Sequence, residues 1–118
     1  MPLSDFHLRK LNEYGFRRWT RGDMDRMYIS AADLGFDYLE SSSGEIELAR
    51  FQGRDVGHRV ARRMHEAKTF LDLNTMTVHS PFPDLARQAA WRVAYVTKGK
   101  WDPSAWDTEI RITLPKGP

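Results

Sequence analysis

The stretch that decides the fold lies between residues 15 and 29 and reads Gly15-Phe16-Arg17-Arg18-Trp19-Thr20-Arg21-Gly22-Asp23-Met24-Asp25-Arg26-Met27-Tyr28-Ile29. A Gly-Asp pair flanked by strand-forming residues is typical of the tight turn of a β-hairpin. A turn centred on Gly22 and Asp23 places Phe16 opposite Ile29, on the same face. A slip of one residue would put these two apolar side chains on opposite faces. The pattern therefore predicts an antiparallel hairpin in this register.

The predicted register divides the hairpin into two chemically different faces. The first face carries the apolar side chains that are expected to be buried, Phe16, Met27 and Ile29. The second face interleaves arginines with aromatic rings: Arg17, Trp19, Arg21, Arg26 and Tyr28. Arginine next to aromatic rings suits stacking on bases and contacts with phosphates. The alternative is that a helix covers Trp19 and Tyr28 and that the arginines only solvate the rim of the core.

Helices and further hairpins are predicted on both sides of this stretch from hydrophobic periodicity, caps and turn residues. The predicted helices are 5–14, capped by Ser4 and ended by Gly15, then 56–67, capped by Asp55, and 84–97, ended by Gly99. The predicted strands are 36–41 with 45–51, 69–73 with 76–80, and a last strand through Ile110, Ile112 and Leu114. This order predicts an α+β fold, an antiparallel sheet built from hairpins with helices packed on one side.

Individual side chains are assigned to faces by the same periodicity. In the hairpin 36–51, Phe36, Tyr38, Ile46 and Leu48 are expected to share the buried face. In the helix 56–67, the buried positions are expected to be Val56, Val60, Ala61, Met64 and Ala67. The two tryptophans of the loop before the last strand, Trp101 and Trp106, are expected to seal an edge of the core.

Length and composition bound the class of protein. A chain of 118 residues with 41% hydrophobic residues is expected to form a single domain, 1–118, with a frayed tail at 115–118. It has no apolar run long enough to span a membrane and no secretion signal at its start. Absence of cysteine excludes disulfides, thiol catalysis and cysteine-bound zinc. These features favour a cytoplasmic protein.

Charge is unevenly distributed although the net charge is only +2. Basic residues dominate 9–26 and 50–68, whereas 33–47 contains five carboxylates and no cation. Thirteen of the eighteen cations are arginine, which suits bidentate contacts with phosphate or carboxylate. The segregation indicates either a polar partner surface or ion pairs within the molecule.

The predicted helix 56–67 presents a basic face formed by His58, Arg59, Arg62, Arg63 and His65. Such a face could contact phosphates. It could also pair with the acidic hairpin or simply face solvent. No helix of adequate length precedes it, which excludes a helix-turn-helix motif.

The hairpin 36–51 carries the opposite charge. Its predicted outer face holds Asp37, Glu45 and Glu47. The period of two describes a solvated strand face, and the segment lacks the ligand spacing of a calcium loop.

Chemistry-bearing motifs are absent from the sequence. The four histidines have no metal-ligand spacing, and no nucleophile elbow, phosphate-binding loop or dinucleotide fingerprint occurs. We therefore expect no cofactor, no metal and no catalytic residue.

Three short segments carry a resemblance: Gly15-Phe16-Arg17-Arg18-Trp19, Asp25-Arg26-Met27-Tyr28-Ile29 and Ala31-Ala32-Asp33-Leu34-Gly35. This pattern, which covers about twenty residues from Gly15 to Gly35, resembles one in small uncharacterised proteins of prophages and mobile elements. The resemblance implies an accessory protein of a phage or mobile element. It assigns no activity and no functional residue.

Three functions follow as hypotheses. The first is non-catalytic binding, by the hairpin face and the basic helix, of nucleic acid or a protein that handles nucleic acid. The second is an anti-defence inhibitor, similar to anti-CRISPR proteins, whose acidic hairpin (Asp37, Glu45, Glu47) mimics phosphates. The third is a small enzyme, or an oligomeric structural protein, of unrecognised family.

Overall fold

The computed structural model describes residues 2–116, so the last two residues of the predicted frayed tail lie outside the described residues. Pro115 and Lys116 are exposed and belong to no helix or strand. The helices are α1 (Asp5–Glu13), α2 (His58–Glu66) and α3 (Pro83–Thr97). The strands are β1 (Arg17–Arg21), β2 (Met24–Ile29), β3 (Phe36–Glu40), β4 (Ile46–Phe51), β5 (Arg54–Asp55), β6 (Thr69–Asp72), β7 (Thr77–His79) and β8 (Glu109–Arg111).

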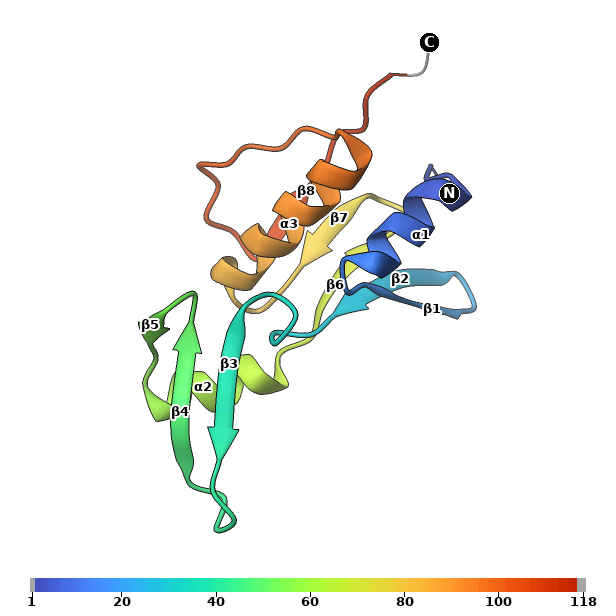
Figure 1. Ribbon diagram of the computed structural model, residues 1–118. Coiled ribbons are helices and arrows are strands. Elements are labelled where there is room, and N and C mark those ends of the chain that lie inside the picture. The colour runs from blue at the N-terminus through green and yellow to red at the C-terminus, as the bar shows by residue number, and fades with distance from the viewer. Residues whose placement is uncertain (1, 117–118) are drawn as a thin grey trace.

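The strands form two antiparallel sheets, and helices pack against both, which confirms the α+β class (Figure 1). Five strands form one sheet in the order β1-β2-β6-β7-β8, and β3-β4-β5 form the second. The expectation of a single sheet was therefore wrong in one respect, because the hairpin 36–51 pairs with β5 and not with the other hairpins.

The first hairpin adopts the predicted register. Arg17 lies opposite Tyr28, and Trp19 lies opposite Arg26. Gly22 occupies the turn with φ of 57°, a left-handed conformation that glycine adopts without steric cost. Three apolar residues of one face are buried as expected: Phe16, Met27 and Ile29.

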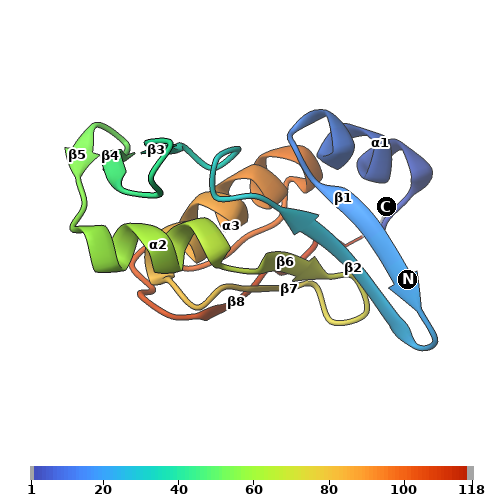
Figure 2. The same cartoon turned by 90° about the horizontal axis from the view of Figure 1, so that it is seen from below.

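Helices α1 and α3 cover one face of the five-stranded sheet (Figure 2). The Ser4 hydroxyl caps α1 by accepting a hydrogen bond from the His7 amide at 3.3 Å. Gly15, with φ of 103°, lets the chain reverse into β1. Three of the fully buried side chains of α3 are small, which lets helix and sheet approach closely: Ala86, Ala89 and Ala90.

Helix α3 ends at residue 97, as predicted, but for a different reason. Lys98, not Gly99, adopts the left-handed conformation that ends the helix, with φ of 57°. Gly99 is required for space, because an added Cβ would lie 2.5 Å from the Ile112 side chain. In the loop that follows, Trp101 packs against the core as expected, but Trp106 is 63% exposed, so its predicted sealing role was wrong.

The third hairpin pairs Leu71 with Val78 as predicted, but its ladder of paired residues is shorter than the predicted strands 69–73 and 76–80. It ends at Asp72 and Thr77, because Met76 adopts a left-handed conformation with φ of 53° in the turn. In this part of the fold, β6 pairs with β2 and β7 pairs with β8.

The three-stranded sheet and α2 project from the main body as a second layered unit (Figure 1). Its buried residues Phe36, Ala49 and Phe51 belong to the same core cluster as those of the larger sheet. The helix begins at His58 with Gly57 as its N-cap. Asp55 is not the cap, because it pairs with Arg50 in the β4–β5 ladder.

Two burial predictions fail in this unit. Val60 is 38% exposed, because α2 buries only Ala61 and Met64. In the hairpin, the loop Ser42–Gly44 closes as expected, with Gly44 at φ of 83°. A β-bulge between Leu39 and Glu40 shifts the register, however, so that Leu48 lies opposite Leu39 on the outer face and is 37% exposed.

Within residues 2–116, no helix combines the length and the apolar character needed to cross a membrane.

Candidate functional site

The face of the five-stranded sheet turned away from α1 and α3 is the candidate functional site. Its side chains are the ones that alternate with the buried core residues of each strand. One row of directly paired positions crosses all five strands and contains Arg17, Tyr28, Phe70, His79 and Glu109. The next row contains Trp19, Arg26, Asp72, Thr77 and Arg111.

Four rings on this face contact one another in sequence, and we call them the aromatic row: Trp19, Tyr28, Phe70 and His79. Trp19 and Tyr28 meet in a T-shaped arrangement at a centroid distance of 6.4 Å. Tyr28 lies 5.2 Å from Phe70, and Phe70 stacks on His79 at 4.8 Å with 16° between the ring planes. Side chains in cross-strand positions approach closely enough to hold one another in place.

Arginines are fixed next to these rings. The guanidinium of Arg26 lies 4.2 Å from the Phe70 centroid and donates a hydrogen bond to the Tyr28 hydroxyl at 3.1 Å. Arg17 donates to the carbonyl oxygens of Asn12 and Phe16, at 2.7 and 3.0 Å. These contacts restrict both side chains, and neither guanidinium forms an ion pair with a carboxylate in the described part of the chain.

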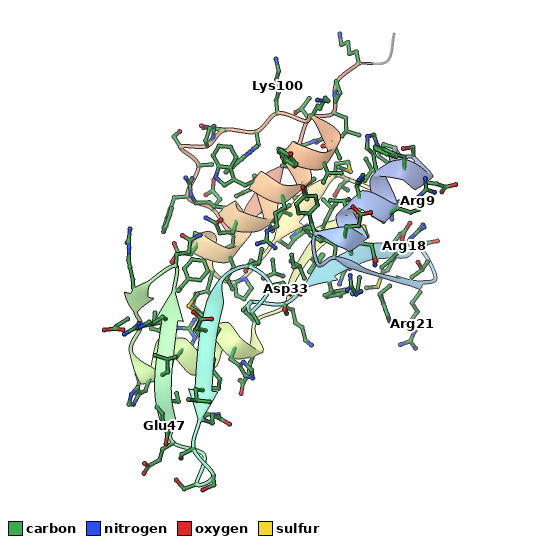
Figure 3. All side chains as sticks on the ribbon, viewed as in Figure 1. Arg9, Arg18, Arg21, Asp33, Glu47 and Lys100 are labelled. Carbon is green, nitrogen blue, oxygen red and sulfur yellow. The ribbon has the colours of Figure 1, made fainter. Side chains whose placement is uncertain are left out.

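The surface contains further cations. Arg21 projects from the tip of the β1–β2 hairpin, whereas Arg18 lies on the α1 side of the same hairpin (Figure 3). On β8, Arg111 shares the open face with the aromatic row, since its neighbours Ile110 and Ile112 are buried. Within residues 2–116, no carboxylate lies in salt-bridge distance of the arginines of the open face: Arg17, Arg21, Arg26 and Arg111.

No helix covers the aromatic row in the described part of the chain. Trp19 is 41% exposed, and Tyr28, Phe70 and His79 are half-buried. The alternative in which a helix buries Trp19 and Tyr28 is therefore wrong. At the far end of the row, the Nδ1 atom of His79 lies 3.1 Å from the Glu109 carboxylate, which orients the imidazole ring.

The predicted basic helix lies apart from the aromatic row. All five residues of its predicted basic face are exposed on α2, namely His58, Arg59, Arg62, Arg63 and His65. The Arg62 guanidinium forms an ion pair with Glu40 at 3.0 Å and donates to the carbonyl of Gly44 at 3.3 Å. The alternative of internal pairing with the acidic hairpin thus holds for Arg62, although its partner is Glu40 and not one of the three predicted carboxylates.

Glu40 is also bound by a second donor. The Tyr38 hydroxyl donates to it at 2.5 Å, and this bond lowers the pKa of Glu40, with burial opposing and Arg62 adding to the effect. The same bond raises the pKa of Tyr38. His65 stacks on the Tyr38 ring at 4.4 Å, so this side chain of α2 is anchored to β3.

The predicted acidic surface is exposed but is not a single patch. Asp37 pairs across the ladder with Arg50, and the intervening outer positions carry Leu39 and Leu48. Glu47 lies where the bulge interrupts the ladder, at the distal end of the unit (Figure 3). Glu45 borders a hollow between the hairpin and α2.

Three residues of the open face were not included in the predicted site: Phe70, His79 and Arg111. Each alternates with buried neighbours in a predicted strand, so the period of two could have assigned them to the open face. The pairing of β6 with β2, which brings Phe70 beside Tyr28, joins strands distant in sequence and leaves no local signal.

No group of three potential metal ligands occurs among residues 2–116. We compared the chain with models of protein families, with curated proteins and with solved structures, and none of the three comparisons found a match.

Proposed function

We propose that this chain binds single-stranded nucleic acid, without catalysis, on the open face of its five-stranded sheet. The observation that supports this proposal is the aromatic row, in which four rings in mutual contact are bordered by arginines. Rings stack on bases of any sequence because every base has a π-face, and arginine supplies contacts to phosphates and further stacking.

A single strand fits this face better than a duplex. In a duplex the base faces are stacked on one another, so an aromatic platform can only accept bases that are splayed out. Five strands span about 19 Å from first to last at a strand spacing of about 4.8 Å. A sheet of similar width stacks two or three bases in known single-strand binders.

The unpaired arginines supply the electrostatic part of the binding. Arg17 and Arg26 lie directly beside rings of the aromatic row, and Arg21 and Arg111 lie at its margins. Each phosphate neutralised by a cation on a single strand is expected to add about −0.7 to the slope of log affinity against log salt. Nucleic-acid binding by this face should therefore weaken steeply with salt.

Fluorescence anisotropy with a labelled single strand and the matching duplex tests the proposal. We expect tighter binding of the single strand, and a loss of affinity between ~50 and ~200 mM salt. Trp19→Ala should weaken binding by about 5- to 150-fold, the equivalent of about 1–3 kcal/mol per stacked base. Trp106→Ala is the matched control, because this tryptophan is also exposed but lies in the loop before β8. A flat salt response, or equal losses in both variants, would contradict the proposal.

A second candidate function is favoured by the projecting hairpin β3–β4. Its outer face exposes Leu39 (51%) and Leu48 (37%) between Asp37 and Arg50, a mixture suited to protein contact. In this candidate the chain inhibits a nucleic-acid-handling complex through the hairpin. Charge reversal at Asp37, Glu45 and Glu47 should abolish capture of such a complex from host lysate, identified by mass spectrometry, without unfolding the chain. Undiminished capture would rule this candidate out.

A further inference from the structure

We propose that the bound strand continues off the sheet onto α2, so that the protein holds one nucleic-acid strand in two consecutive segments. The inference rests on the proposed function and specifies its ligand as a single strand longer than the aromatic row can cover. The first segment would stack on the aromatic row, and the second would be held by the exposed cations of α2.

The two segments lie on the same side of the molecule. In Figure 2 the three-stranded sheet covers α2 from above, just as α1 and α3 cover the five-stranded sheet. The outward side of α2 and the open face of the larger sheet are therefore both turned toward the lower edge of that view. A strand crossing from one to the other does not have to pass around the protein.

A surface hollow lies between the two proposed segments. Its volume is about 430 Å³, and it lies between the first hairpin and the end of α2. Arg17 and Tyr28 line it on the sheet side, and His65 and Lys68 line it on the α2 side. The carboxylates of Asp33 and Glu66 also border it. The hollow thus extends from Tyr28 of the aromatic row to His65 at the end of α2 and to Lys68 just beyond it.

The outward side of α2 offers positive charge without aromatic rings. A second hollow of about 680 Å³ lies between α2 and the β3–β4 hairpin and is lined by His58, Arg59, Arg62 and Arg63 of the helix, together with Gly44, Glu45, Ile46 and Glu66. Arg62 is already paired with Glu40.

Arg59 and Arg63 have no carboxylate within salt-bridge distance among residues 2–116. Arg63 lies over the Phe82 ring at 5.1 Å, which ties this part of α2 to the main body. These two arginines are therefore the groups available for phosphates.

The difference in chemistry predicts different signatures for the two segments. Stacking on the aromatic row should determine the affinity of short and long strands alike. Phosphate contacts on α2 should contribute only when the strand is long enough to reach it, and they should appear mainly in the salt dependence. Each lost phosphate contact should reduce the slope by about 0.7.

The test compares two double variants that each remove two positive charges. Arg59→Gln/Arg63→Gln alters α2, and Arg9→Gln/Lys100→Gln is the control, with one change on α1 and one beyond the end of α3 (Figure 3). Anisotropy is measured with single strands of about 4 and about 16 nucleotides, the range of site sizes in single-strand binders. Each length is used as RNA and as DNA, since the 2′-hydroxyl can contribute to recognition.

We expect the α2 variant to bind the short strand as wild type does, and to lose about 1.4 units of salt slope on the long strand. With a slope difference of about 1.4, the ratio of wild-type to variant affinity changes by roughly 25-fold between 0.1 M and 1 M salt. The control variant should keep the wild-type slope at both lengths. If the α2 variant and the control variant had equal salt slopes on the long strand, both as RNA and as DNA, the inference would be overturned.

The outcome separates this inference from the function on which it rests. If Trp19→Ala weakens binding of the short strand but the α2 variant changes nothing, the proposed function stands and the two-segment path is wrong. If Trp19→Ala leaves the affinity for the short strand unchanged, the proposed function itself fails.

Discussion

Strand β6 allows the two faces of the sheet to be tested with neighbouring residues. Phe70 faces the aromatic row, whereas Leu71 faces the helices and is fully buried between Met27 and Val78. We predict that Phe70→Ala and Leu71→Ala have opposite profiles. The first should mainly weaken nucleic-acid binding, and the second should mainly destabilise the fold.

The expected magnitudes follow from the contacts. Leu71→Ala leaves a cavity in the core and should lower the free energy of unfolding by about 2–5 kcal/mol. Phe70→Ala removes ring contacts with Tyr28 and His79 and the cation–π contact with Arg26. These contacts on a half-exposed face should be worth about 1–2 kcal/mol in stability. At about 4 °C per kcal/mol, the two variants should differ clearly in Tm.

Binding should show the reverse order. Loss of one stacked base costs about 1–3 kcal/mol, so Phe70→Ala should raise the Kd for a single strand by about 5- to 150-fold. Leu71→Ala should leave the Kd near that of wild type at a temperature where it is folded. Urea denaturation followed by tryptophan fluorescence and anisotropy titrations measure the two quantities. If Phe70→Ala destabilised the fold as much as Leu71→Ala, the face would be covered and not open. If the two variants lost affinity equally, binding would not depend on the aromatic row.

Three further predictions concern single residues. The bidentate hydrogen bonds from Arg18, at 2.9 and 2.8 Å, hold the pKa of Asp25 below its usual range. The pair should therefore stabilise the fold by about 0.2–1 kcal/mol above pH ~4, and this contribution should be lost as the pH falls further. Asp25→Asn should lack the contribution when stability against urea is measured as a function of pH. Gly99→Ala should lower the free energy of unfolding by about 1–3 kcal/mol, since its methyl group has no room, and an unchanged Tm would show that the loop moves freely. Arg26→Lys keeps the charge but loses the planar contact with Phe70, so single-strand affinity should fall while the salt slope stays the same; a changed slope with unchanged affinity would contradict this role.

The sequence was sufficient for the elements whose signals are local. The register of the first hairpin follows from Gly22 and from the apolar residues at its two ends, and the structure has the same pairs. The cap at Ser4 and the glycine at position 15 likewise act within one helical turn. Such features depend on neighbours in the chain, which a single sequence displays.

The failures arise where distant segments compete for the same residues. Asp55 has the side chain of a helix cap, but pairing with β4 holds it in a strand. The bulge after Leu39 reverses the face of Leu48, and no residue type marks a bulge there. The aromatic row was half predicted for the same reason: Trp19 and Tyr28 belong to one hairpin, whereas Phe70 and His79 reach them through a long-range pairing.

The pairing of β2 with β6 has a consequence for how the molecule folds. These adjacent strands are separated by residues 30–68, which include the whole three-stranded sheet and α2. Closing a loop of about 40 residues costs about 2 kcal/mol more in chain entropy than closing a four-residue turn. The two local hairpins can form early, but the central seam of the sheet must wait for that closure. The continuous platform of rings is therefore assembled late, because its middle contact, between Tyr28 and Phe70, lies on the seam.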